Sequence, residues 1–100
     1  MSEPGGEWVI AEIQVAPSPA GTADDPHAYV EAAIEVIRGS GLKHEVGALG
    51  TTLEGDADAV WDTLRAAHEA VLAAGARSGL SHVKIASVQR TMDSLTHKFR

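Results

Sequence analysis

The sequence contains no cysteine, and this one absence excludes disulfide bonds, thiol catalysis and thiolate metal sites together. Aromatic residues are also scarce, at 4% of the 100 residues, so few side chains are available to stack on a flat ring. They are Trp8, Tyr29, Trp61 and Phe99. No apolar run approaches the ~18 residues that a membrane-spanning helix needs, so we expect no membrane partner.

Basic residues are few and scattered along the chain. Eight lysines and arginines stand against 14 aspartates and glutamates, which gives a formal net charge of −6. Nucleic acid binding needs a basic patch that neutralises phosphates, so we expect no nucleic acid partner. The opening MSEPGGE lacks the basic and apolar regions of a signal peptide. We therefore expect a disordered tail over residues 1–7, a single domain over residues 8–100, and a cytoplasmic protein.

Alternating side chains and the positions of proline and glycine predict the helices and strands of the chain. In the stretch WVIAEIQV, residues 8–15, every second side chain is apolar and the polar ones lie between them. This alternation is typical of a strand with one buried face. The following APSPAGTADD contains two prolines and a glycine, which predict a loop that ends the strand. Asp25-Pro26 predicts a helix start, with aspartate as the N-cap and proline in the first turn, and Gly39 predicts its end. Strands 42–46 and 49–54 are expected to form a hairpin around Gly47-Ala48. We then expect a helix from about Asp56 to Gly75, a strand over 80–88 and a short helix within 91–100.

The order strand-helix-strand-strand-helix-strand predicts an α+β fold. With right-handed crossovers, it gives a ferredoxin-like βαββαβ sandwich. We expect a four-stranded antiparallel sheet with two helices on one face, plus the short C-terminal helix. The second face of the sheet is then open.

Strand parity divides the side chains between these two faces, because neighbours in a strand point in opposite directions. Parity turns Val9, Ala11, Ile13 and Val15 toward the helices, along with Val46, Leu49, Thr51, Leu53, Val83 and Ile85. It leaves Ile10, Glu12, Gln14, Lys43, Glu45, Gly50, Thr52, Glu54, His82, Lys84 and Ala86 on the open face. This mixture fits a face partly buried against a partner subunit, with polar groups converging on a pocket. Ordinary cross-strand ion pairs on a solvated face are the alternative.

Three phrases of the sequence also resemble a known family. QVAPSPAGT, SGLKHEVGALGTTLEG and AAHEAVLAAGA are similar to segments of the small thiamine-binding proteins of the YkoF-like group. The resemblance runs from Trp8 to the last helix, and its most specific part lies between the first helix and the hairpin. It implies a ferredoxin-like fold, assembly through the sheets into dimers and tetramers, and binding of thiamine or its hydroxymethylpyrimidine moiety. It implies no catalysis, and no cofactor beyond this ligand.

The resemblance and the chemistry of thiamine together name a set of site residues. A carboxylate such as Glu45 or Glu12 can accept from the exocyclic amine of the pyrimidine and offset the thiazolium charge. Gln14 and Thr52 can supply amide and hydroxyl contacts, and Lys84 would pair with the carboxylates. The predicted ligand-binding residues are Glu12, Gln14, Glu45, Gly50, Thr51, Thr52, Glu54 and Lys84.

The residues also bear on three other kinds of function. The five histidines fall on separate elements without the local pairs typical of zinc sites, which argues against a metal centre. Ferredoxin-like sheets also host enzymes, so the fold alone does not decide. The first loop, however, has no arginine to hold an anionic substrate. The remaining alternative is a regulatory or assembly module whose open face serves only oligomerisation.

Overall fold

The computed structural model describes residues 7–100, and the elements in this range follow the predicted order. Residues 1–6, which make up most of the predicted tail, lie outside the described residues. The elements are β1 (Trp8–Ser18), α1 (Ala28–Gly39), β2 (Lys43–Val46), β3 (Thr51–Asp56), α2 (Ala57–Ala74), β4 (Ser78–Ser87), α3 (Met92–Thr96) and the 3₁₀ turn η1 (His97–Phe99).

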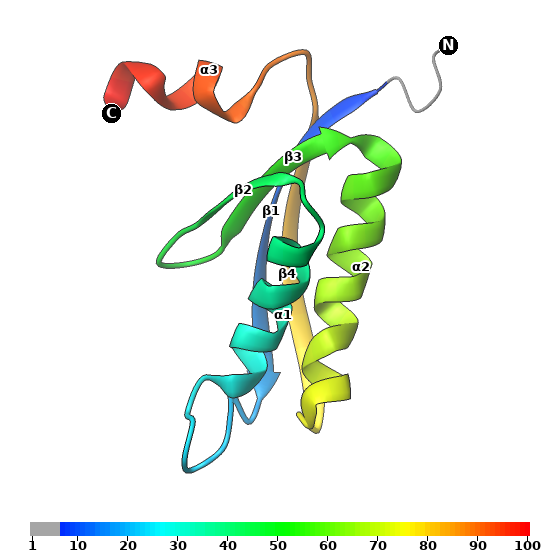
Figure 1. The fold of residues 1–100 in the computed structure, drawn as a ribbon, viewed down its shortest axis with the longest axis vertical. Coiled ribbons are helices and arrows are strands. Elements are labelled where there is room, and N and C mark those ends of the chain that lie inside the picture. Colours follow the sequence, from blue (N-terminus) through cyan, green and yellow to red (C-terminus); the bar gives the residue numbers. More distant parts are fainter. Residues whose placement is uncertain (1–6) are drawn as a thin grey trace.

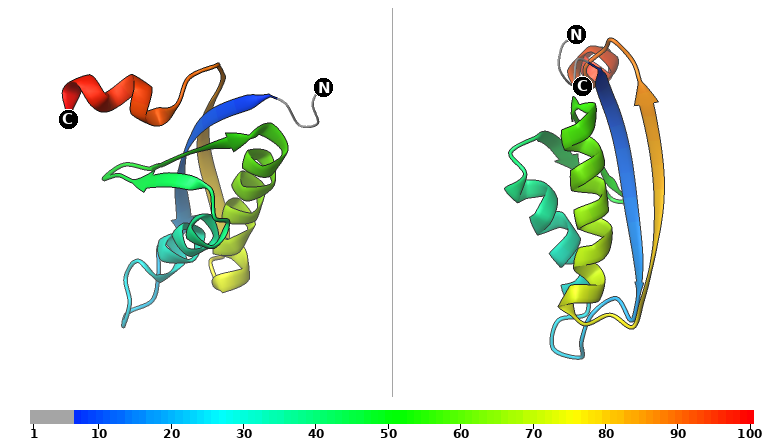
Figure 2. Two further views of the ribbon diagram at one scale, coloured as in Figure 1. Left: turned by 45° about the horizontal axis from the view of Figure 1, so that its top comes forward. Right: turned by 90° about the vertical axis from the view of Figure 1, so that its right-hand side faces the viewer.

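The four strands form one antiparallel sheet in the order β2-β3-β1-β4. Helices α1 and α2 lie side by side on one face of this sheet, as the ribbon in Figure 1 shows. The edge-on view in Figure 2 places both long helices on the same side of β1 and β4. The predicted ferredoxin-like sandwich is therefore confirmed. Within residues 7–100, no helix combines the length and apolar character needed to cross a bilayer.

The core lies between the sheet and the two helices. Its members are Val9, Ala11 and Ile13 of β1, Leu53 of β3, Ala33 and Ile37 of α1, and Val60, Leu64, Ala67 and Val71 of α2, together with Ala76. The odd-numbered residues of β1 point inward, and the helical residues recur every three or four positions. The predicted parity of β1 is thus confirmed, and its even-numbered residues lie on the opposite face.

Strand β1 runs three residues further than predicted and includes Pro17, which was expected to end it. Beyond Ile13, β1 no longer pairs with β3 and has β4 as its neighbour, with Pro17 opposite Gly79. Proline cannot donate to a ladder, but this part of β1 has a neighbouring strand on one side only. The missing N–H therefore does not interrupt the pairing with β4.

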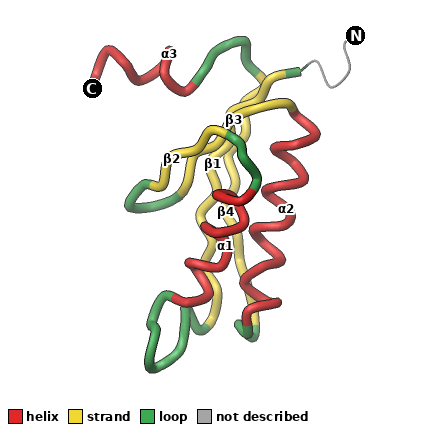
Figure 3. Tube along the Cα trace, viewed as in Figure 1, coloured by secondary structure: helices red, strands yellow, loops and turns green. Residues whose placement is uncertain are grey.

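Helix α1 begins at Ala28, two residues after the predicted start at Pro26, so that boundary was wrong. Asp25 closes a turn instead. Its backbone N–H donates to the Thr22 hydroxyl oxygen at 3.0 Å, and its carbonyl accepts from the Ala28 N–H at 3.1 Å. The backbone of Asp25 is engaged in this turn, and His27 occupies the N-cap position without a side-chain hydrogen bond. The tube in Figure 3 shows the long connection between β1 and α1.

The connection between β2 and β3 is longer than predicted, and it moves Leu49 out of the strand. The Gly47 N–H donates to the Gly50 carbonyl at 2.8 Å, which closes a loop over residues 47–50. Leu49 is 79% exposed, so its predicted place in the core was wrong. Leu53, four residues later, is 0% exposed at the centre of the core.

These two leucines give a paired test of the fold. Leu53→Ala should lower the free energy of unfolding by about 2–5 kcal/mol, because it removes buried methyl groups and leaves a cavity. Leu49→Ala should change it by less than about 0.5 kcal/mol, as is usual at exposed positions. Urea denaturation followed by circular dichroism measures both. Equal losses for the two variants would contradict the hairpin described here.

Candidate functional site

One row of polar side chains crosses all four strands on the open face. Register places Glu45 of β2 opposite Thr52 of β3, Thr52 opposite Glu12 of β1, and Glu12 opposite Lys84 of β4. Strands in a sheet lie about 4.8 Å apart, so directly opposed side chains are within reach of one another. The sheet therefore brings together four of the eight predicted site residues.

Two open hollows lie along this row, and both are lined by Glu12 and Leu49. The first, here called the hairpin hollow, has a volume of about 420 Å³. It is lined by Glu12, Glu45, Val46, Gly47, Ala48, Leu49, Gly50, Thr52 and Arg100. The second, here called the β4 hollow, has a volume of about 610 Å³. It is lined by Glu12, Gln14, Leu49, Ser81, His82, Val83 and Lys84.

Glu12 is the central group of the site because it borders both hollows. Its carboxylate lies 3.7 Å from the Lys84 ammonium, the type of pairing that the sequence predicts for this lysine. The Lys84 side chain is 88% exposed, and exposed pairs of this kind contribute about 0–1 kcal/mol. The lysine is therefore a weak competitor for the carboxylate of Glu12.

Gly50 borders the hairpin hollow where the β2–β3 loop approaches β1. A Cβ atom at this position would lie 3.0 Å from the Ile13 carbonyl oxygen and 3.4 Å from Cγ of Glu12. The backbone of β1 thus approaches this glycine closely. The absence of a side chain also leaves room beside the Glu12 carboxylate.

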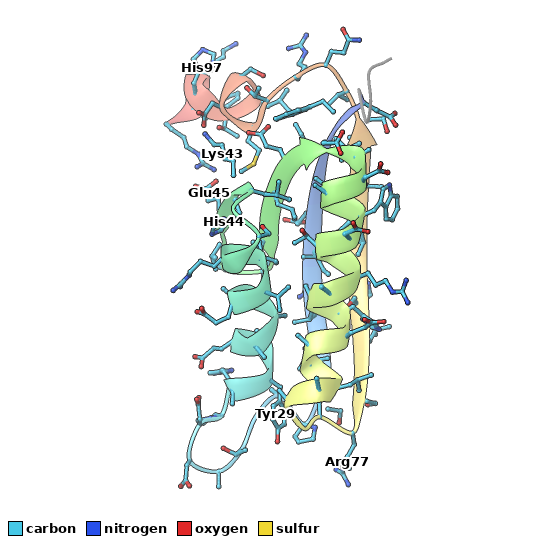
Figure 4. All side chains as sticks on the ribbon, turned by 45° about the vertical axis from the view of Figure 1, so that its right-hand side comes forward. Tyr29, Lys43, His44, Glu45, Arg77 and His97 are labelled. Atoms are coloured by element: carbon cyan, nitrogen blue, oxygen red, sulfur yellow. The ribbon has the colours of Figure 1, made fainter. Side chains whose placement is uncertain are left out.

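The C-terminal segment reaches back to the open-face side chains of β2. Arg100 donates to the Glu45 carboxylate, and the Lys43 ammonium lies 2.6 Å from the Asp93 carboxylate. Figure 4 shows Lys43 and Glu45 beside the turn that carries His97. The hydrogen bond with Lys43 lowers the pKa of Asp93, and the same bond raises the pKa of Lys43. Both groups are thus charged at neutral pH, and the pair is lost as the pH falls through the lowered pKa of Asp93.

Glu54, predicted to bind ligand, lies under this C-terminal segment. Its side chain is on the open face by register, but the residue is only 3% exposed. Oε1 accepts from the Met92 backbone N–H at 2.8 Å and from the Trp8 indole N–H at 3.3 Å. The structure therefore gives Glu54 an internal role, in which it holds the start of α3 against β1 and β3.

Thr51, also predicted to bind ligand, lies on the other side of the sheet. It is buried and lies opposite Ile13 of β1, in agreement with its inward parity. It lines a smaller hollow of about 160 Å³ between α1 and the hairpin, with apolar neighbours that include Ile34 and Val46. The open-face hollows thus contain Glu12, Gln14, Glu45, Gly50, Thr52 and Lys84 but neither Thr51 nor Glu54.

The predicted site leaves out several residues of the hollows, among them two basic ones, His82 and Arg100. His82 lies opposite Gln14, and its open-face parity, which the sequence predicts, could have identified it. Arg100 is 55 residues from Glu45 along the chain, and nothing in the sequence indicates that the two meet. His68 contacts the Ser81 hydroxyl at 2.6 Å and so joins α2 to β4. Among residues 7–100, no three His, Asp or Glu side chains form a group able to hold a metal ion.

Together, the fold and this face define a ferredoxin-like α+β domain with a polar, hollowed sheet face. The chain belongs to the thiamine-binding protein family, which it matches over residues 11–100.

Relatives and solved structures agree with this membership. The chain is 43% identical over 68 residues to a UPF0045 protein of Synechocystis, and 34% identical over 92 residues to one of Clostridium perfringens. These alignments cover 68% and 88% of this chain, and 54% and 93% of the relatives. An alignment with a UPF0045 protein of Methanocaldococcus jannaschii covers 62% of that protein, so the chain spans little more than half of some relatives.

Two solved structures share the fold over almost the whole chain. A domain of unknown function from Bacillus cereus superposes with a TM-score of 0.85 at 33% identity, covering 98% of this chain and 96% of that one. A Thermotoga maritima protein, described as a candidate for thiamine biosynthesis or salvage, has a TM-score of 0.79 at 26% identity. That match covers 93% of this chain and 99% of the other.

The buried carboxylate gives a test of how the C-terminal segment is held. Glu54→Leu should lower the free energy of unfolding by about 1–3 kcal/mol, because the buried Met92 N–H loses its acceptor. Glu54→Gln keeps a carbonyl oxygen near that N–H and should lose less. Urea denaturation measures the difference. A leucine variant as stable as wild type would show that the contact does not hold the segment.

Proposed function

We propose that the chain binds thiamine, or its hydroxymethylpyrimidine moiety, at the open sheet face without changing it chemically. The observation that carries the proposal is the position of Glu12 between two hollows on that face. Membership of the thiamine-binding family supports the class of ligand. The chemistry of the face supports the mode of binding.

Glu12 is proposed as the principal acceptor for the aminopyrimidine. Its side chain is partly exposed, so it can reach ligand while the sheet holds its backbone. A carboxylate accepts strong hydrogen bonds from an exocyclic amine and favours a nearby cationic thiazolium. Gly50 leaves space beside this carboxylate.

The neighbours of Glu12 are proposed to complete the recognition. Thr52 lies directly opposite Glu12 on β3, and its hydroxyl can donate to or accept from a ring nitrogen. Gln14 lies one pleat further along β1, on the β4 hollow, and offers both amide functions. Glu45 offers a second carboxylate at the far side of the hairpin hollow. Thr51 and Glu54 lie outside this proposed contact set.

The open hollows also suggest how subunits would assemble. We propose that the domain forms a homotetramer, or a dimer, through its sheet face, and that a second subunit closes the hollows over the ligand. Ligand pockets usually bury most of the ligand surface, which a shallow face on one chain does not achieve. The proposed setting is the cytoplasm, and the proposed role is binding rather than catalysis.

An assembly module without a small-molecule ligand is the second candidate. Exposed apolar side chains at the edges of the face favour it, notably Leu49 and Leu80. Exposed apolar side chains mark surfaces that contact other proteins where they gather into one large patch. The two candidates differ in whether a ligand binds, and calorimetry separates them.

Glu12→Gln gives the main test of the ligand site. The variant should weaken thiamine binding by about 10- to 100-fold, because it replaces a charge-assisted hydrogen bond with a neutral one. Glu31→Gln, an equal change of charge on the exposed surface of α1, should leave the affinity unchanged. Isothermal titration calorimetry with thiamine and with hydroxymethylpyrimidine measures both variants.

Light scattering on the same samples gives the control for assembly. Glu12→Gln should keep the oligomeric state of the wild type. If wild-type protein gives no heat with thiamine, its phosphates or the pyrimidine, the ligand proposal is wrong and the assembly module is favoured. If Glu12→Gln dissociates the oligomer, the residue belongs to a subunit interface.

A further inference from the structure

A basic residue from the far end of the chain lies in the hairpin hollow. Arg100 donates to the carboxylate of Glu45, and both side chains are about half exposed. The hydrogen bond with Glu45 is the main cause that raises the pKa of Arg100, and nearby Asp93 adds to the effect. The hollow therefore holds two carboxylates, Glu12 and Glu45, and one guanidinium.

Arg100 is held in this position by a chain of internal contacts. Thr91 and Ser94 form a reciprocal cap at the start of α3, and the Met92 N–H donates to buried Glu54. Asp93 pairs with Lys43 of β2. At the other end of the segment, the Arg100 N–H donates to the carbonyl of His97, which closes the 3₁₀ turn. The segment is thus fixed to β2 and β3 at two points, and these contacts place the Arg100 guanidinium in the hairpin hollow.

We propose that Arg100 sets the charge preference of the site, disfavouring a purely cationic ligand and favouring one that also carries a phosphate. This inference rests on the proposed function and deepens it. It assigns to Arg100 the choice between thiamine and thiamine phosphate, and hence the class of ligand.

The physical reason is that one guanidinium affects the two ligand charges in opposite ways. A cationic thiazolium near Glu45 has to displace Arg100 or remain close to a like charge, and either one weakens binding. A phosphate near the same hollow gains a planar donor pair from the arginine, the geometry in which guanidinium recognises phosphate. Lys84, at the other end of the row, adds a second positive charge that such a ligand can approach.

Arg100→Gln removes this charge and gives the test, with Lys98→Gln as the matched control. Lys98 lies in the same segment and carries the same charge, with its ammonium 6.0 Å from the centre of the Phe99 ring and outside the lining of the hollow. Calorimetry with thiamine and with thiamine monophosphate, at one ionic strength, gives an affinity ratio for each protein. We expect Arg100→Gln to shift this ratio about tenfold toward thiamine, the size of one charge-assisted contact, and Lys98→Gln to leave it unchanged.

A second variant and two further outcomes complete the test and keep this inference separate from the proposed function. Arg100→Lys keeps the charge but loses the planar donor pair, so its ratio should lie between those of the wild type and Arg100→Gln. If the wild type binds a ligand and the ratio is the same in all the variants, Arg100 does not set the preference, while the proposed function stands. If the wild type binds neither ligand, this inference is wrong, and the proposed function is wrong with it unless hydroxymethylpyrimidine alone binds.

Discussion

The antiparallel pairing of β1 with both β3 and β4 is the interaction on which the rest of the structure depends. It places Val9, Ala11 and Ile13 in the core and the alternate residues on the open face. A slip of one residue would exchange the two faces and bury Glu12 under the helices. The hydrophobic residues of β1 thus stabilise the fold and, through the same register, position the carboxylate at the centre of the candidate site.

Charge on the open face is balanced in a way that the net charge of −6 does not suggest. Each carboxylate of the polar row has a basic partner, Lys84 for Glu12 and Arg100 for Glu45. The pair of Glu12 with Lys84 is solvent-exposed and contributes little to stability, so a ligand can exchange with this lysine at low cost. Glu54 differs because it is buried and bonded to two internal donors. Three carboxylates on one face therefore have two different roles, which their surroundings determine.

Local patterns in the sequence predict most of the fold and part of the site. Alternation in β1 and helical spacing in α2 depend on neighbours in the chain, so they give the order of elements and the faces of Glu12, Thr52 and Lys84. Contacts between distant segments leave no local pattern. Glu54 is buried by contact with Met92, 38 residues away, and the Glu45 carboxylate accepts a hydrogen bond from Arg100, 55 residues away. The backbone of a four-residue loop likewise decides the position of Leu49, which strand parity assigns to the core.

Contacts between ligand and protein, measured by isotope-filtered nuclear Overhauser spectroscopy, test the central claim most directly. Thiamine bound on the open face should give cross-peaks from its pyrimidine methyl group to the methyl groups of Thr52 and Leu49, which line the hairpin hollow. Cross-peaks to Val30 and Ile34 instead would place the ligand in the apolar hollow between α1 and the hairpin. That result would contradict a site centred on Glu12.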